Sequence, residues 1–172
     1  MEKKPVSHFI GGLITACVII IYSIILNFMD LGTNQALGYV SYVFLFGGII
    51  YFITLYGKSI DYNASFGKLF TFGFKMTALI TIIMIAFLVI FFGVFPEFKE
   101  KFFEVAREAM IKQGKNTEQQ IEMGLSVFKK FFWIFIIGGT IFGYMLAGAI
   151  ASLIGAAVTK KNPQSPFSPT IQ

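Results

Sequence analysis

Hydrophobic and polar residues divide this chain into long blocks. Four apolar blocks cover residues 9–29, 36–56, 69–95 and 131–158, and polar segments separate them. Each block has the roughly 20 residues that an α-helix needs to cross a hydrocarbon core about 30 Å thick. Backbone amides in lipid must be bonded within their own segment, and these blocks do not alternate polar and apolar residues as barrel strands do. The sequence therefore predicts an all-α membrane protein with four transmembrane helices.

The polar segment between the third and fourth blocks, residues 97–130, repeats apolar residues at helical spacing. Two series advance in steps of four, three and four, which is the spacing of coiled coils. They consist of Phe98, Phe102, Val105 and Ala109, followed by Ile121, Leu125, Phe128 and Phe132. A turn centred near Lys115 sets Ala109 opposite Ile121, Val105 opposite Leu125, Phe102 opposite Phe128 and Phe98 opposite Phe132. We therefore expect an extramembrane helical hairpin between spans three and four.

Local signals delimit the two hairpin helices. Pro96 suits the first turn of a helix, and Gly114 suits a helix stop. Thr117 and Gln120 have the spacing of a capping box. Two orientations stay open. The matched series favour a hairpin that stands upright as an extension of the spans, whereas its many phenylalanines and Trp133 would suit a hairpin lying flat in the membrane interface.

The fourth block carries small residues at every fourth position, namely Gly139, Gly143, Ala147, Ala151 and Gly155. Small residues at this step let two helix backbones approach closely in a membrane. The pattern predicts a tight helix–helix contact, either within the chain or with another copy. A shorter pair of small residues in the first block, Gly12 and Ala16, is a candidate partner within the chain.

Charged residues make up 13% of the chain, against about 25% in soluble domains. The net charge is +5, but the lysines stand at the ends of the blocks and not in one patch, which argues against nucleic-acid binding. With four spans, three short lysine-bearing segments share one side of the membrane: Lys3 and Lys4, Lys58 and Lys68, Lys160 and Lys161. On the other side, the link at residues 30–35 has no Lys or Arg, whereas the long link at 97–130 holds seven Lys/Arg and six glutamates. We give more weight to the three short segments, because the positive-inside rule holds best for short links. By the positive-inside rule we expect both termini to be cytoplasmic.

Lys75 is the one charge inside a predicted span. An intramembrane ion is a functional candidate, and here it could bind a lipid or serve another function. The competing interpretation, which we favour, is that its stem reaches the nearby interface. His8 and Cys17 lack the acid and base partners that metal sites or hydrolytic triads require. We therefore expect no enzyme activity and no cofactor.

Residues 1–161 are expected to form a single transmembrane domain, and residues 162–172, with three prolines, a disordered tail. Several short motifs also resemble a known family. They are Tyr56-Gly57, Ser65-Phe66-Gly67, Gly73-Phe74-Lys75, Phe95-Pro96-Glu97-Phe98, the run from Gly148 to Ala156, and Lys160-Lys161. On these residues the chain resembles the bacterial domain-of-unknown-function family 4199. That resemblance implies a multi-pass protein of the bacterial inner membrane and supplies no activity.

The function expected from the sequence is assembly or contact with a partner protein, in the lipid bilayer and beside it. A non-enzymatic membrane protein would use the hairpin and span four for assembly with itself or with another membrane protein. The alternative is a small transporter or channel component. Transporters usually place an ionisable group near mid-membrane, and none is evident in these blocks.

Overall fold

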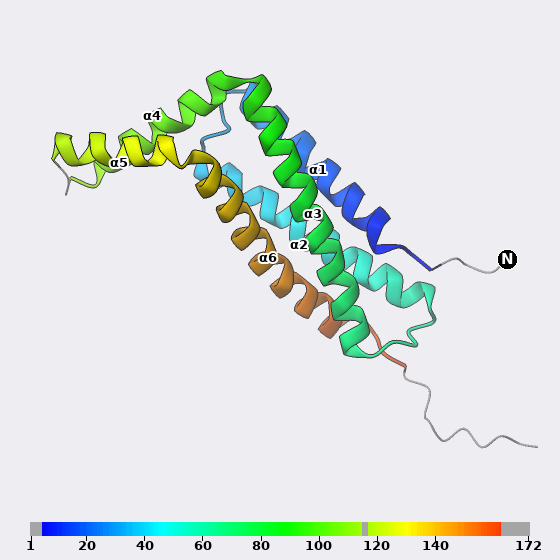
Figure 1. The fold of residues 1–172 in the computed structure, drawn as a ribbon. Coiled ribbons are helices and arrows are strands. Elements are labelled where there is room, and N and C mark those ends of the chain that lie inside the picture. The colour runs from blue at the N-terminus through cyan, green and yellow to red at the C-terminus, as the bar shows by residue number, and fades with distance from the viewer. Residues whose placement is uncertain (1–4, 115–116, 163–172) are drawn as a thin grey trace, which may run out of the picture.

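The computed structural model describes residues 5–114 and 117–162. Within them all regular structure is helical (Figure 1). The helices are α1 (His8–Phe28), α2 (Gln35–Ser59), α3 (Phe66–Val94), α4 (Pro96–Lys112), α5 (Glu118–Lys130) and α6 (Phe132–Val158). Four of them, α1, α2, α3 and α6, are long and apolar enough to cross a membrane, which confirms the predicted fold class. The expected turn at Lys115 and the tail at 163–172 lie outside the described residues.

Polar side chains fix where the membrane helices begin. Ser7 caps α1 by accepting a hydrogen bond from the backbone N–H of Phe9. Asn34 caps α2, and Ser65 caps α3 by accepting from the N–H of Lys68. Each cap satisfies a backbone donor that the first helical turn would otherwise leave without a partner. Because Ser65 is the cap, α3 begins three residues before the apolar block that predicted it.

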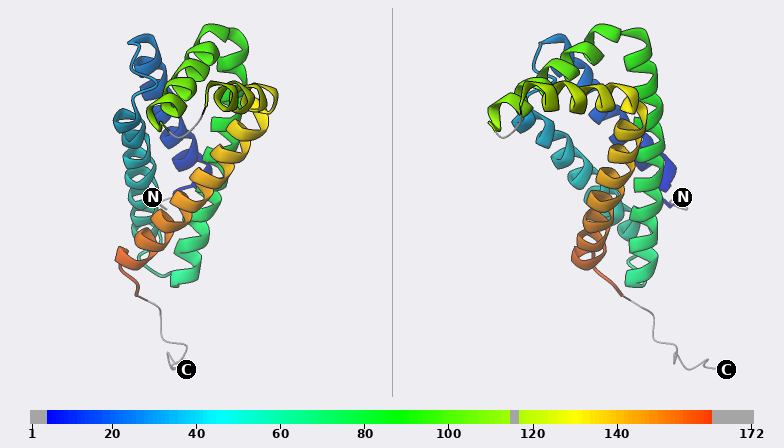
Figure 2. Two further views of the ribbon diagram at one scale, coloured as in Figure 1. Left: turned by 90° about the vertical axis from the view of Figure 1, so that its left-hand side faces the viewer. Right: turned by 60° about the vertical axis from the view of Figure 1, so that its left-hand side comes forward.

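Helices α2 and α3 form the centre of the bundle. Both contact α1 on one side and α6 on the other, and they contact each other (Figure 2). Successive spans run in opposite directions. The start of α1, the α2–α3 link and the end of α6 therefore meet at one end, at the lower right of Figure 1. The α1–α2 link and the hairpin lie at the other end, which we call the outer end.

Small residues bring the spans together. A Cβ built on Gly148 of α6 would overlap the side chain of Thr77 on α3, and one built on Gly73 of α3 would lie 3.0 Å from Cβ of Ser152. Gly155 of α6 approaches the backbone of α2, where its Cβ would be 3.3 Å from Cα of Ile50. Lipid is as apolar as the helix surfaces, so such close packing is what holds membrane helices together.

Hydroxyl groups buried in these contacts are satisfied within their own helices. Thr15, Thr77, Thr81 and Ser152 are all buried, and each donates to the carbonyl four residues earlier at 2.6–3.0 Å. A buried hydroxyl without a partner would cost about 1–3 kcal/mol. These residues therefore act as small packing residues that leave no unbonded polar group in the core.

The hairpin turns away from the membrane helices. Figures 1 and 2 show α4 and α5 running sideways from the outer ends of α3 and α6, with the paired helices projecting past the bundle. The upright arrangement favoured from the sequence is therefore wrong. The cause is local: Pro96 lacks an N–H and forces Phe95 out of the helical region, to φ −121° and ψ 73°. A second break occurs at Phe131, between α5 and α6.

α4 is attached to the outer end of α1. Lys101 forms an ion pair with Asp30 in the α1–α2 link. Next to it, the ring of Phe28 meets the rings of Phe95 and Phe98 edge to face, each at 5.8 Å between centroids. Such aromatic pairs contribute about 0.5–1.5 kcal/mol beyond burial. The hairpin is therefore held to the bundle by contacts at the base of α4 as well as by its two connections.

The α3–α6 contact can be tested at Gly148. We expect Gly148→Ala to lower the free energy of unfolding by about 1–3 kcal/mol, because the added methyl group overlaps Thr77. Gly138→Ala on the same helix is the matched control, since a Cβ there has no neighbour within 4 Å. It should leave stability unchanged or raise it. Unfolding in mixed micelles, followed by circular dichroism, measures both; equal losses would contradict the contact.

Candidate functional site

Aromatic side chains fill the inside of the hairpin. Phe103 of α4 and Phe132 at the start of α6 are buried, with ring centroids 5.3 Å apart, and Phe128 of α5 lies 5.7 Å from Phe103. Ile121 and Leu125 are also buried. The apolar series expected on α5 therefore faces the hairpin interior at Ile121, Leu125, Phe128 and Phe132. The capping box of Thr117 and Gln120 is present as expected.

The α4 face that packs on α5 is offset by one residue from the expected series. Phe103 is buried, and Ala106 and Met110 are half-buried against α5. Val105 and Ala109, expected in the interior, are exposed and line a cavity against the α1–α2 link and the start of α2.

Phe102 and Phe98 also lie differently from the expectation. Phe102 is exposed, although its ring lies 6.2 Å from that of Phe128. Phe98 stacks on Phe91 of α3 at 5.2 Å and does not meet Phe132. The reason is that α4 lies across the outer end of the bundle and covers two neighbours, so its apolar residues are shared between α5 and the bundle.

Ionic contacts join the polar faces of the hairpin helices. Arg107 of α4 reaches Glu122 of α5, with Nη2 3.1 Å from Oε1, and Glu118 at 4.0 Å. Nζ of Lys99 lies 4.9 Å from the ring centroid of Phe132, and Nζ of Lys129 lies 5.3 Å from that of Phe103. These are exposed pairs worth about 1 kcal/mol or less each, so they set the register of the helices more than their stability.

A second apolar face of α5 is left uncovered. Met123 and Val127 of α5 are exposed, and the series continues in steps of four and three to Phe131 at the helix break and Ile134 of α6, which are exposed as well. We call these residues the α5 stripe. It leads directly to exposed residues on the outer half of α6, including Phe135 and Phe142. Gly138 and Gly139 lie between these two phenylalanines in the sequence, and a Cβ on either would have no neighbour within 4 Å.

Most of the small-residue series on α6 is used inside the chain. A Cβ on Gly143 would meet the hydroxyl of Tyr42 on α2 at 2.9 Å, Ala147 packs against the core, Ala151 is fully buried, and Gly155 packs on α2. Gly139 alone of the five stays open. Sequence reasoning missed Gly148 and Ser152, which contact α3 one position further round the helix.

The candidate partner of that series in the first span is elsewhere. A Cβ on Gly12 would meet Leu79 and the backbone oxygen of Met76, both on α3. Ala16 is buried in the same core. Gly12 therefore packs against α3, and the proposed pairing of the first span with span four is wrong.

A cavity of about 550 Å³ lies under the hairpin at the outer end. Asp30, Lys101, Glu104 and Glu108 stand among its lining residues, and its lining extends to Ser23 on α1 and Thr140 on α6. Thr140 donates to the carbonyl of Ile136 at 2.7 Å. The cavity therefore has a charged rim and an aromatic wall that includes Phe87 and Phe91.

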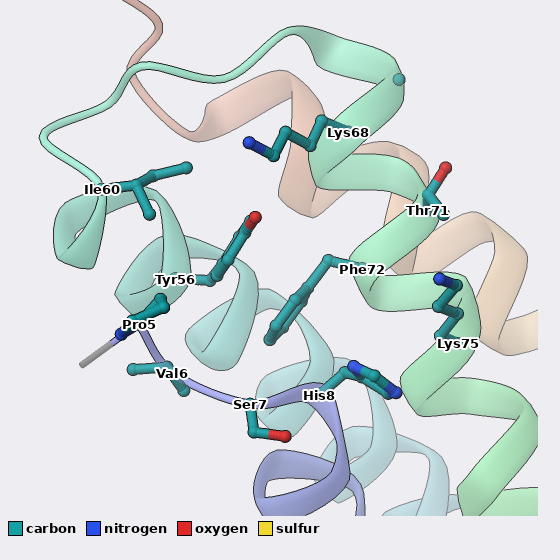
Figure 3. A pocket seen from close by; sticks show the side chains of 11 residues that line it. Pro5, Val6, Ser7, His8, Tyr56, Ile60, Lys68, Thr71, Phe72 and Lys75 are labelled. Carbon is teal, nitrogen blue, oxygen red and sulfur yellow. The ribbon is translucent and has the colours of Figure 1, made fainter.

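Lys75 lies beside a separate pocket at the opposite end. Lys68, Thr71 and Lys75 of α3 line this pocket, and Figure 3 shows Lys68 extending toward the end of α2. Phe72 stacks on Tyr56 with centroids 4.3 Å apart and planes 9° apart, and it meets the ring of His8 at 6.1 Å. The sequence singled out Lys75 but not the pocket, because its walls come from segments about 50 residues apart.

A family model described as "Protein of unknown function (DUF4199)" matches residues 10–161. The chain belongs to this family. The match spans all four membrane helices and the hairpin, so the DUF4199 family covers the whole fold described above. No curated protein and no solved structure matches the chain.

The offset face of α4 can be tested by cysteine pairing in this DUF4199 protein. In a Cys17→Ala background, we expect cysteines at Ala106 and Leu125 to form a disulfide within one chain faster than cysteines at Val105 and Leu125. The reason is that Ala106 packs on the cluster containing Leu125, whereas Val105 faces the cavity over the α1–α2 link. Gel mobility after mild oxidation measures disulfide formation in both pairs. A faster disulfide in the Val105 pair would mean that α4 packs on α5 through the face expected from the sequence.

Proposed function

We propose that this chain is a non-enzymatic protein of the bacterial inner membrane that acts by contact with a neighbouring membrane protein, in its simplest form a second copy of itself. The contact surface is the α5 stripe together with the outer half of α6. The observation that carries the proposal is that exposed apolar residues follow one another along the chain from Met123 in the hairpin to Phe142 in span four, and that the chain leaves them uncovered.

The shape of this surface favours a helical partner beside α6. Gly138 and Gly139 have open space where a side chain would be, so another helix can approach the α6 backbone closely. The stripe then extends the contact beyond the membrane along α5. Its far side carries Glu118, Glu122 and Lys129, which leaves a polar face toward water. On α6 exposed apolar residues also suit lipid, but on α5, outside the spans, exposed apolar residues such as Met123 and Val127 mark an interaction site.

The chemistry of the chain supports a role in contact and not in catalysis. The buried hydroxyls of Thr15, Thr77, Thr81 and Ser152 are each engaged with a carbonyl of their own helix. The lysines gather at span ends, as expected of a protein whose partners are the lipid bilayer and other membrane proteins, with no nucleic acid. The proposal involves no cofactor.

Both termini are proposed to be cytoplasmic. The support is that the lysine-bearing segments come together at one end of the bundle. The N–H of Val6 donates to Oγ of Ser59 at 3.3 Å, and the N–H of Asn162 donates to the carbonyl of Tyr62 at 2.9 Å. The positive-inside rule then applies to all three segments at once.

The alternative, a small transporter or channel component, is favoured by the cavity under the hairpin. Its charged rim and the polar residues Ser23 and Thr140 would suit a polar solute entering from the outer end. The buried hydroxyls of Thr15, Thr77, Thr81 and Ser152, deeper in the bundle, each donate to a carbonyl of their own helix and therefore have no free proton to offer a solute. We therefore rank contact ahead of transport.

The contact surface can be tested by oxidising single cysteines in membranes. In a Cys17→Ala background, we expect Ile134→Cys to form a covalent dimer, since two copies meeting at this surface bring the same residue together. Ile82→Cys on α3 is the matched control, because its exposed fraction, 65%, is nearly that of Ile134 at 67%. Non-reducing gels measure the dimer.

The outcomes of this test separate the partners. Dimers from Ile134→Cys and not from Ile82→Cys support self-association. A bismaleimide adduct of Ile134→Cys with a different membrane protein supports a heterologous partner. Equal reaction at both positions would mean random collision and would refute the surface.

The orientation can be tested with reporter fusions. We expect alkaline phosphatase fused after residue 162 to be inactive, and the same enzyme inserted between residues 114 and 117 to be active, because the enzyme needs an oxidising compartment. Colony colour and whole-cell activity measure both fusions. An active carboxyl-terminal fusion would reverse the topology.

A further inference from the structure

We propose that the pocket between the start of α1, the end of α2 and the first turns of α3 binds the phosphate head group of an anionic membrane lipid. The pocket has a volume of about 730 Å³ and lies at the end of the bundle where the start of α1 and the end of α6 meet. It is distinct from the α5 stripe and from the outer cavity, and the proposal is independent of the function proposed above.

The lining of the pocket places cations along one wall. Lys68, Thr71 and Lys75 recur on one face of α3 in steps of three and four, and all three line the pocket (Figure 3). Their spacing of seven residues separates the Lys68 and Lys75 backbones by about 10 Å along the helix. Ammonium groups on flexible stems can close this distance around one phosphate, or each can hold one phosphate of a lipid that carries two.

The opposite wall supplies hydrogen-bond donors. Ser7 and His8 line it at the first turn of α1, and Tyr56 lines it from α2. The positive end of the α1 dipole lies at this turn, and α1 has no acidic residue in its first turn to offset it. A phosphate between the two walls would therefore meet positive charge from α3 and donors from α1.

Charge around the pocket has one dominant sign. Among the described residues, this end of the bundle carries lysines at 58, 68, 75, 160 and 161 but a single carboxylate, Asp61. In the part of the chain that the structure describes, neither Lys68 nor Lys75 has a carboxylate within 4 Å. Basic pockets between membrane helices that lack such neutralising partners favour acidic head groups.

The apolar part of the pocket points to a lipid as the source of the phosphate. The stacked rings of Phe72 and Tyr56 form its floor, and Val6 and Ile60 complete the apolar surface. Lys75 lies nine residues into α3, about 13 Å along the helix, and its side chain is exposed. A head group held there would leave its acyl chains beside the exposed apolar surface of the spans.

The experiment measures lipid binding by the full-length chain in mild detergent. Native mass spectrometry would quantify binding of phosphatidylglycerol, phosphatidylcholine with the same acyl chains, and inorganic phosphate. The variants are Lys75→Gln, Lys68→Gln and the double variant. The matched control is Lys160→Gln, a lysine at the same end that does not line the pocket.

We expect the chain to bind phosphatidylglycerol more tightly than phosphatidylcholine. Each of Lys75→Gln and Lys68→Gln should weaken phosphatidylglycerol binding about fivefold, and the double variant more, whereas Lys160→Gln should not. The unfolding temperature without lipid should be the same in all variants, which shows that they fold.

Three results would overturn the proposal. An equal loss in Lys160→Gln would mean that the lipid responds only to the general positive charge of this end. Equal binding of the two lipids would remove the phosphate charge as the determinant. Inorganic phosphate that displaces bound phosphatidylglycerol at equal concentration would identify a soluble phosphate, and not a lipid, as the ligand.

Discussion

The close approach of α3 and α6 is the contact on which the rest of the structure depends. It exists because Gly73 and Gly148 carry no side chain where the two helices need the space, and Gly155 does the same where α6 meets α2. In lipid no hydrophobic force drives helices together, so the fit of backbone against backbone supplies most of the attraction. Thr77 and Ser152 enter this contact without a desolvation penalty because each hydroxyl is bonded within its own helix. Because α4 follows α3 and α5 precedes α6, the packing of α3 on α6 also fixes where the two hairpin helices begin.

The same helix serves inward and outward contact at different depths. From Gly143 to Gly155 the small residues of α6 are used against α2 and α3, whereas Gly138 and Gly139 near the outer end have no neighbour. Internal packing accounts for the inner part of the small-residue series. The outer part has no neighbour in the chain and belongs to the surface that we propose for a partner.

How much the sequence could predict depends on how many neighbours a segment has. The four spans were predictable because lipid requires apolar side chains on every exposed face of a membrane helix. α5 was predictable because its buried face packs on a single neighbouring helix, α4. α4 was not, since Phe98 and Val105 pack toward the bundle while Phe103 packs toward α5. The bend at Phe95 was signalled by Pro96, but the contact of Lys101 with Asp30 joins residues 71 positions apart, which no local pattern indicates. The pocket beside Lys75 is formed by segments remote in sequence, and no local sequence pattern predicts that they lie together.

The two helix breaks give the hairpin the geometry of a lever. Phe95 and Phe131 are single non-helical residues that connect α4 to α3 and α5 to α6. α4 is 17 residues long, about 25 Å, so the tip of the hairpin lies far from both joints. The aromatic cluster of Phe103, Phe128 and Phe132 packs α4 against α5 close to the breaks at Phe95 and Phe131. A load applied at the tip therefore acts as a torque on the outer ends of α3 and α6, the pair of helices whose close contact organises the bundle.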